Sequence, residues 1–121
     1  ENFAKFEEWN RSYEEINSFE NHLVTDNTVL MKFWLHISPE EQLKRFEERQ
    51  NNGWKNYKIT DEDWRNREKW DEYEMAADEM LVRTSTSKTP WYIIPANDKK
   101  FARIEVLKIY VKNMEKALKN R

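Results

Sequence analysis

Cysteine is absent from the sequence, and glycine occurs once, at Gly53. A chain without cysteine forms no disulfide, no thiolate metal site and no cysteine nucleophile. This composition is most natural in a reducing cytoplasm, where we expect the protein to be located. An average chain carries about 7% glycine. Since hairpin turns use glycine for positive φ angles, folds made of many short hairpins are disfavoured, and helices with a few strands are expected.

Long apolar runs are missing as well. Lys32 interrupts the longest one, which falls far short of the roughly 20 residues that span a bilayer. Residues 1–11 lack the apolar segment of a signal peptide, and we expect no membrane partner. Large side chains are plentiful, with six Trp, six Phe and five Tyr in 121 residues. They argue against disorder and predict one domain, or part of one, with a compact and aromatic-rich core.

Charge is distributed unevenly along the chain, although the net charge is only -2. Residues 1–48 carry 5 basic and 11 acidic side chains, residues 49–98 carry 8 and 10, and residues 99–121 carry 8 and 2. The first two parts are therefore net negative, at -6 and -2, and the last part is net positive, at +6. Such an end is compatible with an anionic partner, and a solvated helix face would give the same pattern.

The first half of the chain is typical of a helix, a strand and a helix. Apolar residues recur every three or four positions over 3–23, which predicts an amphipathic helix that ends at the polar turn 25–27. Residues 29–37 are almost continuously apolar and predict a strand covered on both faces, as in a parallel sheet. In such a strand we expect His36 to be a buried structural residue. Ser38 then caps a helix that begins with proline.

The second half repeats this order. A helix is predicted from about residue 60 to residue 83, and a Ser/Thr loop at 84–89 leads to a short strand at 91–94. The last helix follows a cap at Asn97 or Asp98. Its apolar stripe consists of Phe101, Ile104, Leu107, Val111, Met114 and Leu118. Two buried strands separated by helices predict an α/β sheet with parallel pairing. Because two strands make a marginal sheet, the chain looks like part of a larger one.

Few residues form a pattern with specific chemistry. His22 and His36 have no serine and acid arranged around them, and zinc would need several His or Cys ligands at short spacing. Carboxylates are so numerous that close pairs among them give no specific signal. The more informative group is basic and surrounds the loop at Gly53: Arg45, Arg49, Lys55, Lys58, Arg65 and Arg67. Cations on such a segment suit a polyanion, but ion pairing on helix surfaces, as between Glu41 and Arg45, explains them too and is the interpretation that the residues alone favour.

Several of these residues belong to a longer pattern. It comprises the strand and cap of residues 30–38, then Glu40, Glu41, Gln42, Arg45, Phe46, Glu48 and Arg49, the run 55–60, Asp63, Arg67, Trp70, Tyr73, the run 84–86, Pro90, Trp91, the run 97–99, Ala102 and Arg103. This pattern resembles the C-terminal half of the polyphosphate kinase 2 family. The run 57–67 is most similar to the second domain of two-domain polyphosphate:AMP phosphotransferases. The resemblance extends without gaps over residues 13–103.

The resemblance implies a helix-rich part of a three-layer α/β/α kinase fold of the P-loop type, with two parallel strands and a helical lid. Residues 1–49 would form helix, strand and helix, residues 50–83 the lid region, and residues 84–121 the loop, strand and C-terminal helix. The reaction implied is transfer of a terminal phosphoryl group from polyphosphate to AMP or another nucleotide, with Mg²⁺.

The family's basic positions in the lid correspond to Arg45, Arg49, Lys55, Lys58 and Arg67 of this sequence. Cations of this kind bind phosphate oxygens and stabilise charge on the transferred group. Asp63 would support the site by orienting Arg67 through a helical ion pair. The aromatic residues Trp70, Tyr73 and Trp91 are assigned to packing.

Two motifs of the family are absent from these 121 residues: the glycine-rich Walker A loop that ends in Gly-Lys, and the Walker B segment. In the family both precede the region that this chain matches. We therefore expect a C-terminal, lid-containing fragment that carries no catalytic or metal-binding residue and is inactive alone.

Two alternatives remain at this point. The chain could be a non-enzymatic helical module that binds polyanions, including nucleic acid, through its basic end, although we do not expect nucleic acid as the partner. It could also be an oligomerisation domain. A sheet with unpaired strand edges favours a homo-oligomer in either case.

Overall fold

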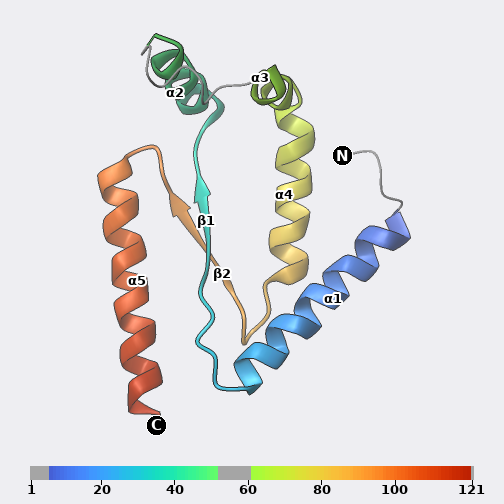
Figure 1. The fold of residues 1–121 in the computed structure, drawn as a ribbon, viewed down its shortest axis with the longest axis vertical. Coiled ribbons are helices and arrows are strands. Elements are labelled where there is room, and N and C mark those ends of the chain that lie inside the picture. The colour runs from blue at the N-terminus through green and yellow to red at the C-terminus, as the bar shows by residue number, and fades with distance from the viewer. Residues whose placement is uncertain (1–5, 52–60, 121) are drawn as a thin grey trace.

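The computed structural model describes residues 6–51 and 61–120. In chain order the elements are α1 (Phe6–Thr25), β1 (Lys32–His36), α2 (Pro39–Asn51), α3 (Asp61–Glu68), α4 (Trp70–Thr84), β2 (Trp91–Pro95) and α5 (Lys99–Lys119) (Figure 1). The helix-rich α/β class predicted from the sequence is confirmed. Gly53 lies outside the described residues.

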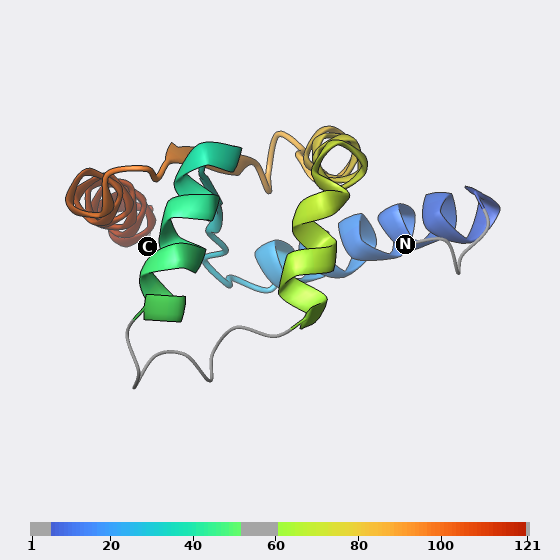
Figure 2. The same cartoon turned by 90° about the horizontal axis from the view of Figure 1, so that it is seen from above.

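β1 and β2 form a parallel sheet, as predicted, with Lys32 opposite Trp91 and His36 opposite Pro95. The two views show a helix layer on each side of the strands: α5 lies on one side, and α4 with α1 lies on the other (Figures 1 and 2). This arrangement is typical of parallel strands, because the connections between them place helices on both faces of the sheet. The described residues therefore form three layers.

The best-packed region lies between the sheet and α5. Ile94, Ala96 and Ala102 are buried there, and Phe33, Ile37, Tyr92, Val106 and Ile109 pack against them. The rings of Phe33 and Tyr92, which are paired across the strands, have their centroids 5.7 Å apart. Small residues at positions 96 and 102 let the start of α5 approach the end of β2 closely. This contact fixes the direction in which α5 leaves the sheet.

β1 is shorter and more exposed than the sequence predicted. It covers residues 32–36 rather than 29–37, and its last two residues, Leu35 and His36, are exposed. His36 is therefore not the buried structural residue that we expected. Full burial of a parallel strand requires a neighbour on each edge and a helix on each face, whereas β1 pairs with β2 alone among the described residues.

The prediction of a compact, aromatic-rich core is also wrong, because few of the described aromatic side chains are buried. Of the aromatic side chains that the structure describes, Phe46 is the only one in the buried class. It packs edge-on against Trp64 of α3, with ring centroids 5.1 Å apart. The other described aromatics lie half-buried or exposed along the layers. Their large rings cover surface between elements instead of filling one centre.

The single helix predicted from residue 60 to 83 is two helices, α3 and α4. The break is at Lys69, whose φ of -100° and ψ of 27° leave the helical region. The amide of Lys69 donates to the carbonyl of Asn66 at 3.2 Å, and the hydroxyl of Tyr73 lies 3.0 Å from Oδ1 of Asn66. Because the axis changes direction here, α3 lies beside α2 while α4 runs along the sheet (Figure 1).

The polar caps that the sequence predicted for α2 and α5 are confirmed. The amide of Glu41 donates to Oγ of Ser38 at 3.1 Å, at the start of α2. The side chain of Asp98 accepts from the amides of Lys100 and Phe101, so Asp98 rather than Asn97 caps α5. Within the described stretches, no helix is both long and apolar enough to cross a membrane.

Candidate functional site

The carboxyl ends of both strands meet at one edge of the molecule, next to α2 and α3 (Figure 1). Ligands of open α/β sheets usually bind at this edge. Here the two strand ends are joined by side chains: the amide of Ser38 donates to Oδ1 of Asn97 at 3.0 Å, and Nδ2 of Asn97 lies 3.4 Å from Oγ of Ser38. The residues that follow β1 and β2 are thereby held together.

Arg45 anchors α2 to this edge. Its Nε donates to Oε1 of Glu41 at 3.0 Å, which confirms the geometry of the helical ion pair considered from the sequence. Its Nη2 donates to the carbonyl of Ala96 at 2.7 Å and to that of Asn97 at 3.3 Å. A half-buried guanidinium with one carboxylate and two carbonyl partners holds a fixed position. Arg45 therefore links the end of β2 to α2.

Arg67 performs the corresponding role between α3 and α2. Its Nη1 donates to the carbonyl of Pro39 at 2.9 Å and lies 3.4 Å from Oε1 of Gln42. These partners are neutral, and among the side chains that the structure describes no carboxylate forms an ion pair with Arg67. Asp63, its expected partner, has a side chain outside the described ones. The positive charge of Arg67 thus faces the first turn of α2.

The other predicted cations divide into two groups. Arg49 is exposed in the last turn of α2, and Arg65 is exposed on α3. Lys55 and Lys58 lie outside the described residues. The structure therefore places Arg45, Arg49 and Arg67 on the two helices beyond the carboxyl edge, with Arg45 and Arg67 already engaged in holding those helices.

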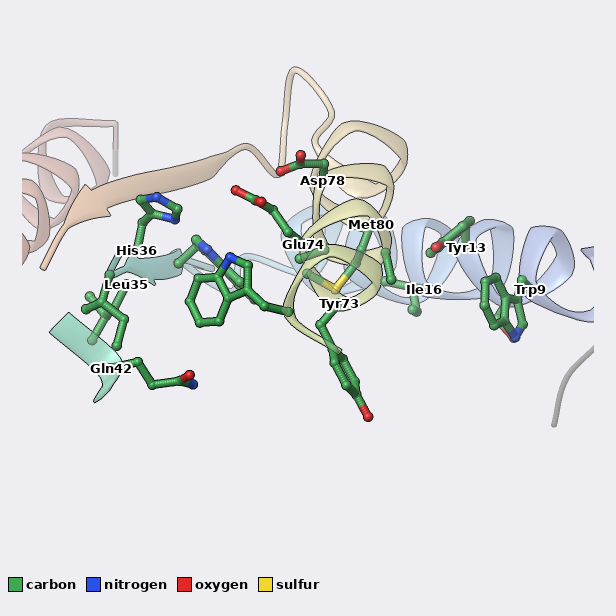
Figure 3. Close-up of a pocket in the computed structure, with 16 residues that line it drawn as sticks. Trp9, Tyr13, Ile16, Leu35, His36, Gln42, Tyr73, Glu74, Asp78 and Met80 are labelled. Atoms are coloured by element: carbon green, nitrogen blue, oxygen red, sulfur yellow. The ribbon is translucent and has the colours of Figure 1, made fainter. Parts of the chain in front are cut away.

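An open pocket of about 610 Å³ lies between α1, β1 and α4 (Figure 3). Its walls are mostly apolar, formed by Trp9, Tyr13 and Ile16 of α1, Trp34 and Leu35 of β1, Ile37, and Trp70, Tyr73, Ala76, Ala77 and Met80 of α4; Ser12 adds a hydroxyl. The main polar groups are His36, Gln42, Glu74 and Asp78. Figure 3 shows Glu74 and Asp78 on the side of α4 that faces the strand bearing His36. A pocket with these walls suits a flat apolar group with hydrogen-bonding edges.

Tyr13 connects the two helical walls of the pocket. Burial raises the pKa of its hydroxyl above 10.0, and the negative charge of Glu79 acts in the same direction, whereas Arg83 opposes both. The guanidinium of Arg83 lies 5.2 Å from the centroid of the Tyr13 ring and also bonds to Asn10 of α1. At neutral pH the hydroxyl is therefore protonated, and its ring packs under a cation.

Sequence reasoning missed this pocket. The spacing of Trp9, Tyr13 and Ile16 was interpreted as an ordinary core-facing stripe, and Trp70 and Tyr73 were assigned to packing alone. Periodicity identifies which residues face inward, but it does not show whether the opposing surface fills the space between them. The acidic residues Glu74 and Asp78 gave no signal because carboxylates are common throughout the chain.

A metal ion would need several His, Asp or Glu side chains close together as ligands. Across the two described stretches, no group of three or more His, Asp or Glu side chains is placed to hold one. Mg²⁺, which the resemblance implies, therefore has no ligand set among these residues.

Comparison with known proteins covers the whole chain. The family model of polyphosphate kinase 2 (PPK2) matches residues 1–121. A polyphosphate:AMP phosphotransferase of Acinetobacter johnsonii is 53% identical over 95% of this chain, and one of Pseudomonas aeruginosa is 47% identical over 98%. In both cases the match covers 24% of the relative. The chain thus spans about a quarter of the length of these relatives.

Solved structures agree with the sequence comparison. A crystallised polyphosphate kinase 2 homologue of Pseudomonas aeruginosa PA01 is similar with a TM-score of 0.92 and 46% identity, covering 98% of this chain and 26% of the other. Polyphosphate kinase 2 of Arthrobacter aurescens TC1 gives a TM-score of 0.83 and 36% identity, covering 87% of this chain and 38% of the other. Sequence and fold together show that the chain belongs to the polyphosphate kinase 2 family.

Proposed function

We propose that this chain is the lid-bearing, C-terminal part of a polyphosphate-dependent nucleotide kinase that transfers phosphate to AMP. The observation that carries the proposal is the 53% identity to a polyphosphate:AMP phosphotransferase over 95% of the chain. The position of Arg45, Arg49 and Arg67 on the two helices beyond the carboxyl edge of the sheet supports it, since α/β folds bind phosphorylated ligands next to this edge.

The three arginines would contribute in different ways. Phosphoryl transfer depends mainly on positioning and on cations that stabilise charge on the transferred oxygens. Arg49 is exposed in the last turn of α2, where it can reach a polyphosphate chain. Arg67 has neutral partners, so its charge remains available to attract phosphate toward the start of α2. Arg45 is a positioning residue that keeps α2 fixed to the strand ends.

Lys55, Lys58 and the supporting Asp63 stay part of the proposed site on the strength of the resemblance alone. We assign none of the described residues to Mg²⁺, since they offer no ligand set for it. The ion would be held by other parts of the enzyme.

Arg49→Ala in the full kinase that contains this chain tests the proposed site. Arg49 is preferable to Arg67, because loss of Arg67 also breaks the contact between α3 and α2. We expect kcat for polyphosphate-dependent ADP formation to fall about tenfold or more, since one cation near the transferred phosphate is lost. The thermal midpoint of unfolding should remain unchanged, because the Arg49 side chain is exposed.

Lys44→Ala is the matched control, because Lys44 is another exposed cation on the same helix. Its kcat should stay within about twofold of the parent value. Equal losses in the two variants would point to a general charge effect and remove Arg49 from the site.

The alternative of a polyanion-binding module has one observation in its favour: Lys99, Lys100, Arg103, Lys108, Lys112, Lys116 and Lys119 are all exposed on α5. Binding of this kind is indifferent to the identity of the polyanion and weakens steeply with salt. Titration of polyphosphate against an unrelated polyanion of equal charge distinguishes the two functions. A preference for polyphosphate supports the kinase, and equal affinities support the module.

A further inference from the structure

Asn97 lies in the short loop between β2 and α5, and its side chain bonds to the first residue of the turn that follows β1 into α2. Its Oδ1 accepts a hydrogen bond from the amide of Ser38 at 3.0 Å, and its Nδ2 lies 3.4 Å from Oγ of Ser38. An asparagine amide can accept and donate at the same time, so one side chain holds Ser38 at two atoms. Asn97 therefore determines where Ser38 lies relative to the end of β2.

Both residues that bind Arg67 are attached directly to Ser38. Pro39, whose carbonyl accepts from Nη1 of Arg67 at 2.9 Å, is the next residue in the chain. Since the proline ring fixes its φ angle at about -65°, few free torsions separate that carbonyl from Ser38. The amide of Gln42 donates to the carbonyl of Ser38 at 3.0 Å, and Oε1 of Gln42 lies 3.4 Å from Nη1 of Arg67. A displacement of Ser38 would therefore move both acceptors of Arg67.

We propose that Asn97 is a positioning residue for Arg67. It holds Ser38, and through Ser38 it keeps the first turn of α2 at the place where the guanidinium of Arg67 meets phosphate. The inference rests on the proposed function, in which Arg67 attracts phosphate toward the start of α2. A binding group of this kind has to be held to within about 0.5 Å of its productive position. Asn97 acts through Ser38 and needs no contact with the substrate.

The contacts of Asn97 matter more for this position than for the stability of the fold. The Asn97 side chain is exposed, and water can replace a hydrogen bond between exposed neutral groups at little cost. Other bonds hold the two strand ends together: Nη2 of Arg45 donates to the carbonyl of Ala96 at 2.7 Å, and the amide of Ala96 donates to the carbonyl of His36 at 2.7 Å. Loss of the Asn97 side chain should therefore leave the sheet intact and release only the start of α2.

Steady-state kinetics of the full kinase that contains this chain test the proposal. Asn97→Ala should raise KM for polyphosphate about threefold, the equivalent of one neutral hydrogen bond, while KM for AMP and the thermal midpoint of unfolding stay unchanged. Arg67→Ala should raise KM for polyphosphate about tenfold, because it removes the cation. In the double variant, Asn97→Ala should add nothing to the effect of Arg67→Ala, because the residue that Asn97 positions is gone.

Asn113→Ala is the matched control, because the side chain of Asn113 also forms hydrogen bonds, to the carbonyl of Ile109 and with the hydroxyl of Tyr92, but on α5 and away from α2. Its KM for polyphosphate should equal the parent value, and a rise as large as in Asn97→Ala would overturn the inference. Effects of Asn97→Ala and Arg67→Ala that multiply in the double variant would also overturn it, as would an unchanged KM in Asn97→Ala alone. An unchanged KM in Arg67→Ala would instead refute the proposed role of Arg67, and the inference with it.

Discussion

Lys32 connects three parts of the fold through one side chain. It is 7% exposed, and its Nζ donates to Oε1 of Glu20 in α1 at 2.8 Å and to the carbonyl of Thr84 at the end of α4 at 2.5 Å. The same ammonium lies 4.9 Å from the ring centroid of Trp91 on β2. In the sequence Lys32 only interrupted an apolar run. In the structure it joins the sheet to both helices on that side.

We expect Lys32→Met to lower the free energy of unfolding by about 3 kcal/mol. The substitution keeps the volume but leaves the carboxylate of Glu20, whose side chain is 14% exposed, without its partner. Urea denaturation followed by tryptophan fluorescence measures the change. Lys44→Met is the control at an exposed position of α2 and should cost less than about 0.5 kcal/mol.

The double variant Lys32→Met with Glu20→Leu separates the charge from the packing. If the cost of the single change comes from an unpaired carboxylate, removal of that carboxylate should recover most of the lost stability. A double variant that is less stable than Lys32→Met would contradict this explanation.

At the scale of elements, polar caps were the most reliable local signals. Ser38 and Asp98 both bond the free amides of the following helix, as their positions before α2 and α5 predicted. Such bonds depend on residues within three positions of each other, so the sequence contains all the necessary information. Asn97 could have capped α5 equally well by type. It instead bonds Ser38, a residue 59 positions away, which no local pattern could indicate.

Asp98→Ala should destabilise the protein by about 1 kcal/mol, because the amides of Lys100 and Phe101 lose their acceptor at the start of α5. Asp98→Asn keeps an acceptor oxygen at the same place and should cost less than half as much. Thermal unfolding monitored at 222 nm compares the two variants. Equal costs would indicate that the charge, rather than the hydrogen bonds, stabilises this helix end.

The division of one predicted helix into α3 and α4 shows where local reasoning ends. Helix-forming residues continue through Lys69, so composition gives no reason for a break. The break allows Trp64 of α3 to contact Phe46 of α2 while α4 follows the sheet. Arg67 then reaches the carbonyl of Pro39. These contacts join residues far apart in the chain, and they decide the direction of the helix.

At the scale of the whole molecule, much apolar surface remains exposed. Leu35 and Ile93 on the strands, Phe19 on α1 and Leu107 on α5 are each more than half exposed. A complete domain of this size would cover most such side chains. The chain also spans about a quarter of the length of its phosphotransferase relatives. Both observations agree with the expectation that its sheet is part of a larger one.

We expect the 121 residues alone to form no ADP from AMP and polyphosphate. One glycine, at position 53, is too few for a glycine-rich phosphate loop, and the sequence has no Gly-Lys pair. A coupled assay for ADP, with a full-length relative as the positive control, measures this directly. Turnover approaching that of the relative would show that the chain carries its own catalytic groups.

The sequence by itself determined the α/β class, the parallel pairing and the caps at Ser38 and Asp98. The residue pattern was also sufficient to identify the family. These features follow from short-range bonding and from the periodic placement of apolar residues, which the linear order contains. The tertiary structure decided which face of α5 meets the sheet, where the helical stretch of α3 and α4 breaks, and which cations are engaged. Those outcomes depend on the surfaces that distant segments present to one another. Only packing decides which apolar face of a helix becomes buried and which of several possible partners an arginine binds.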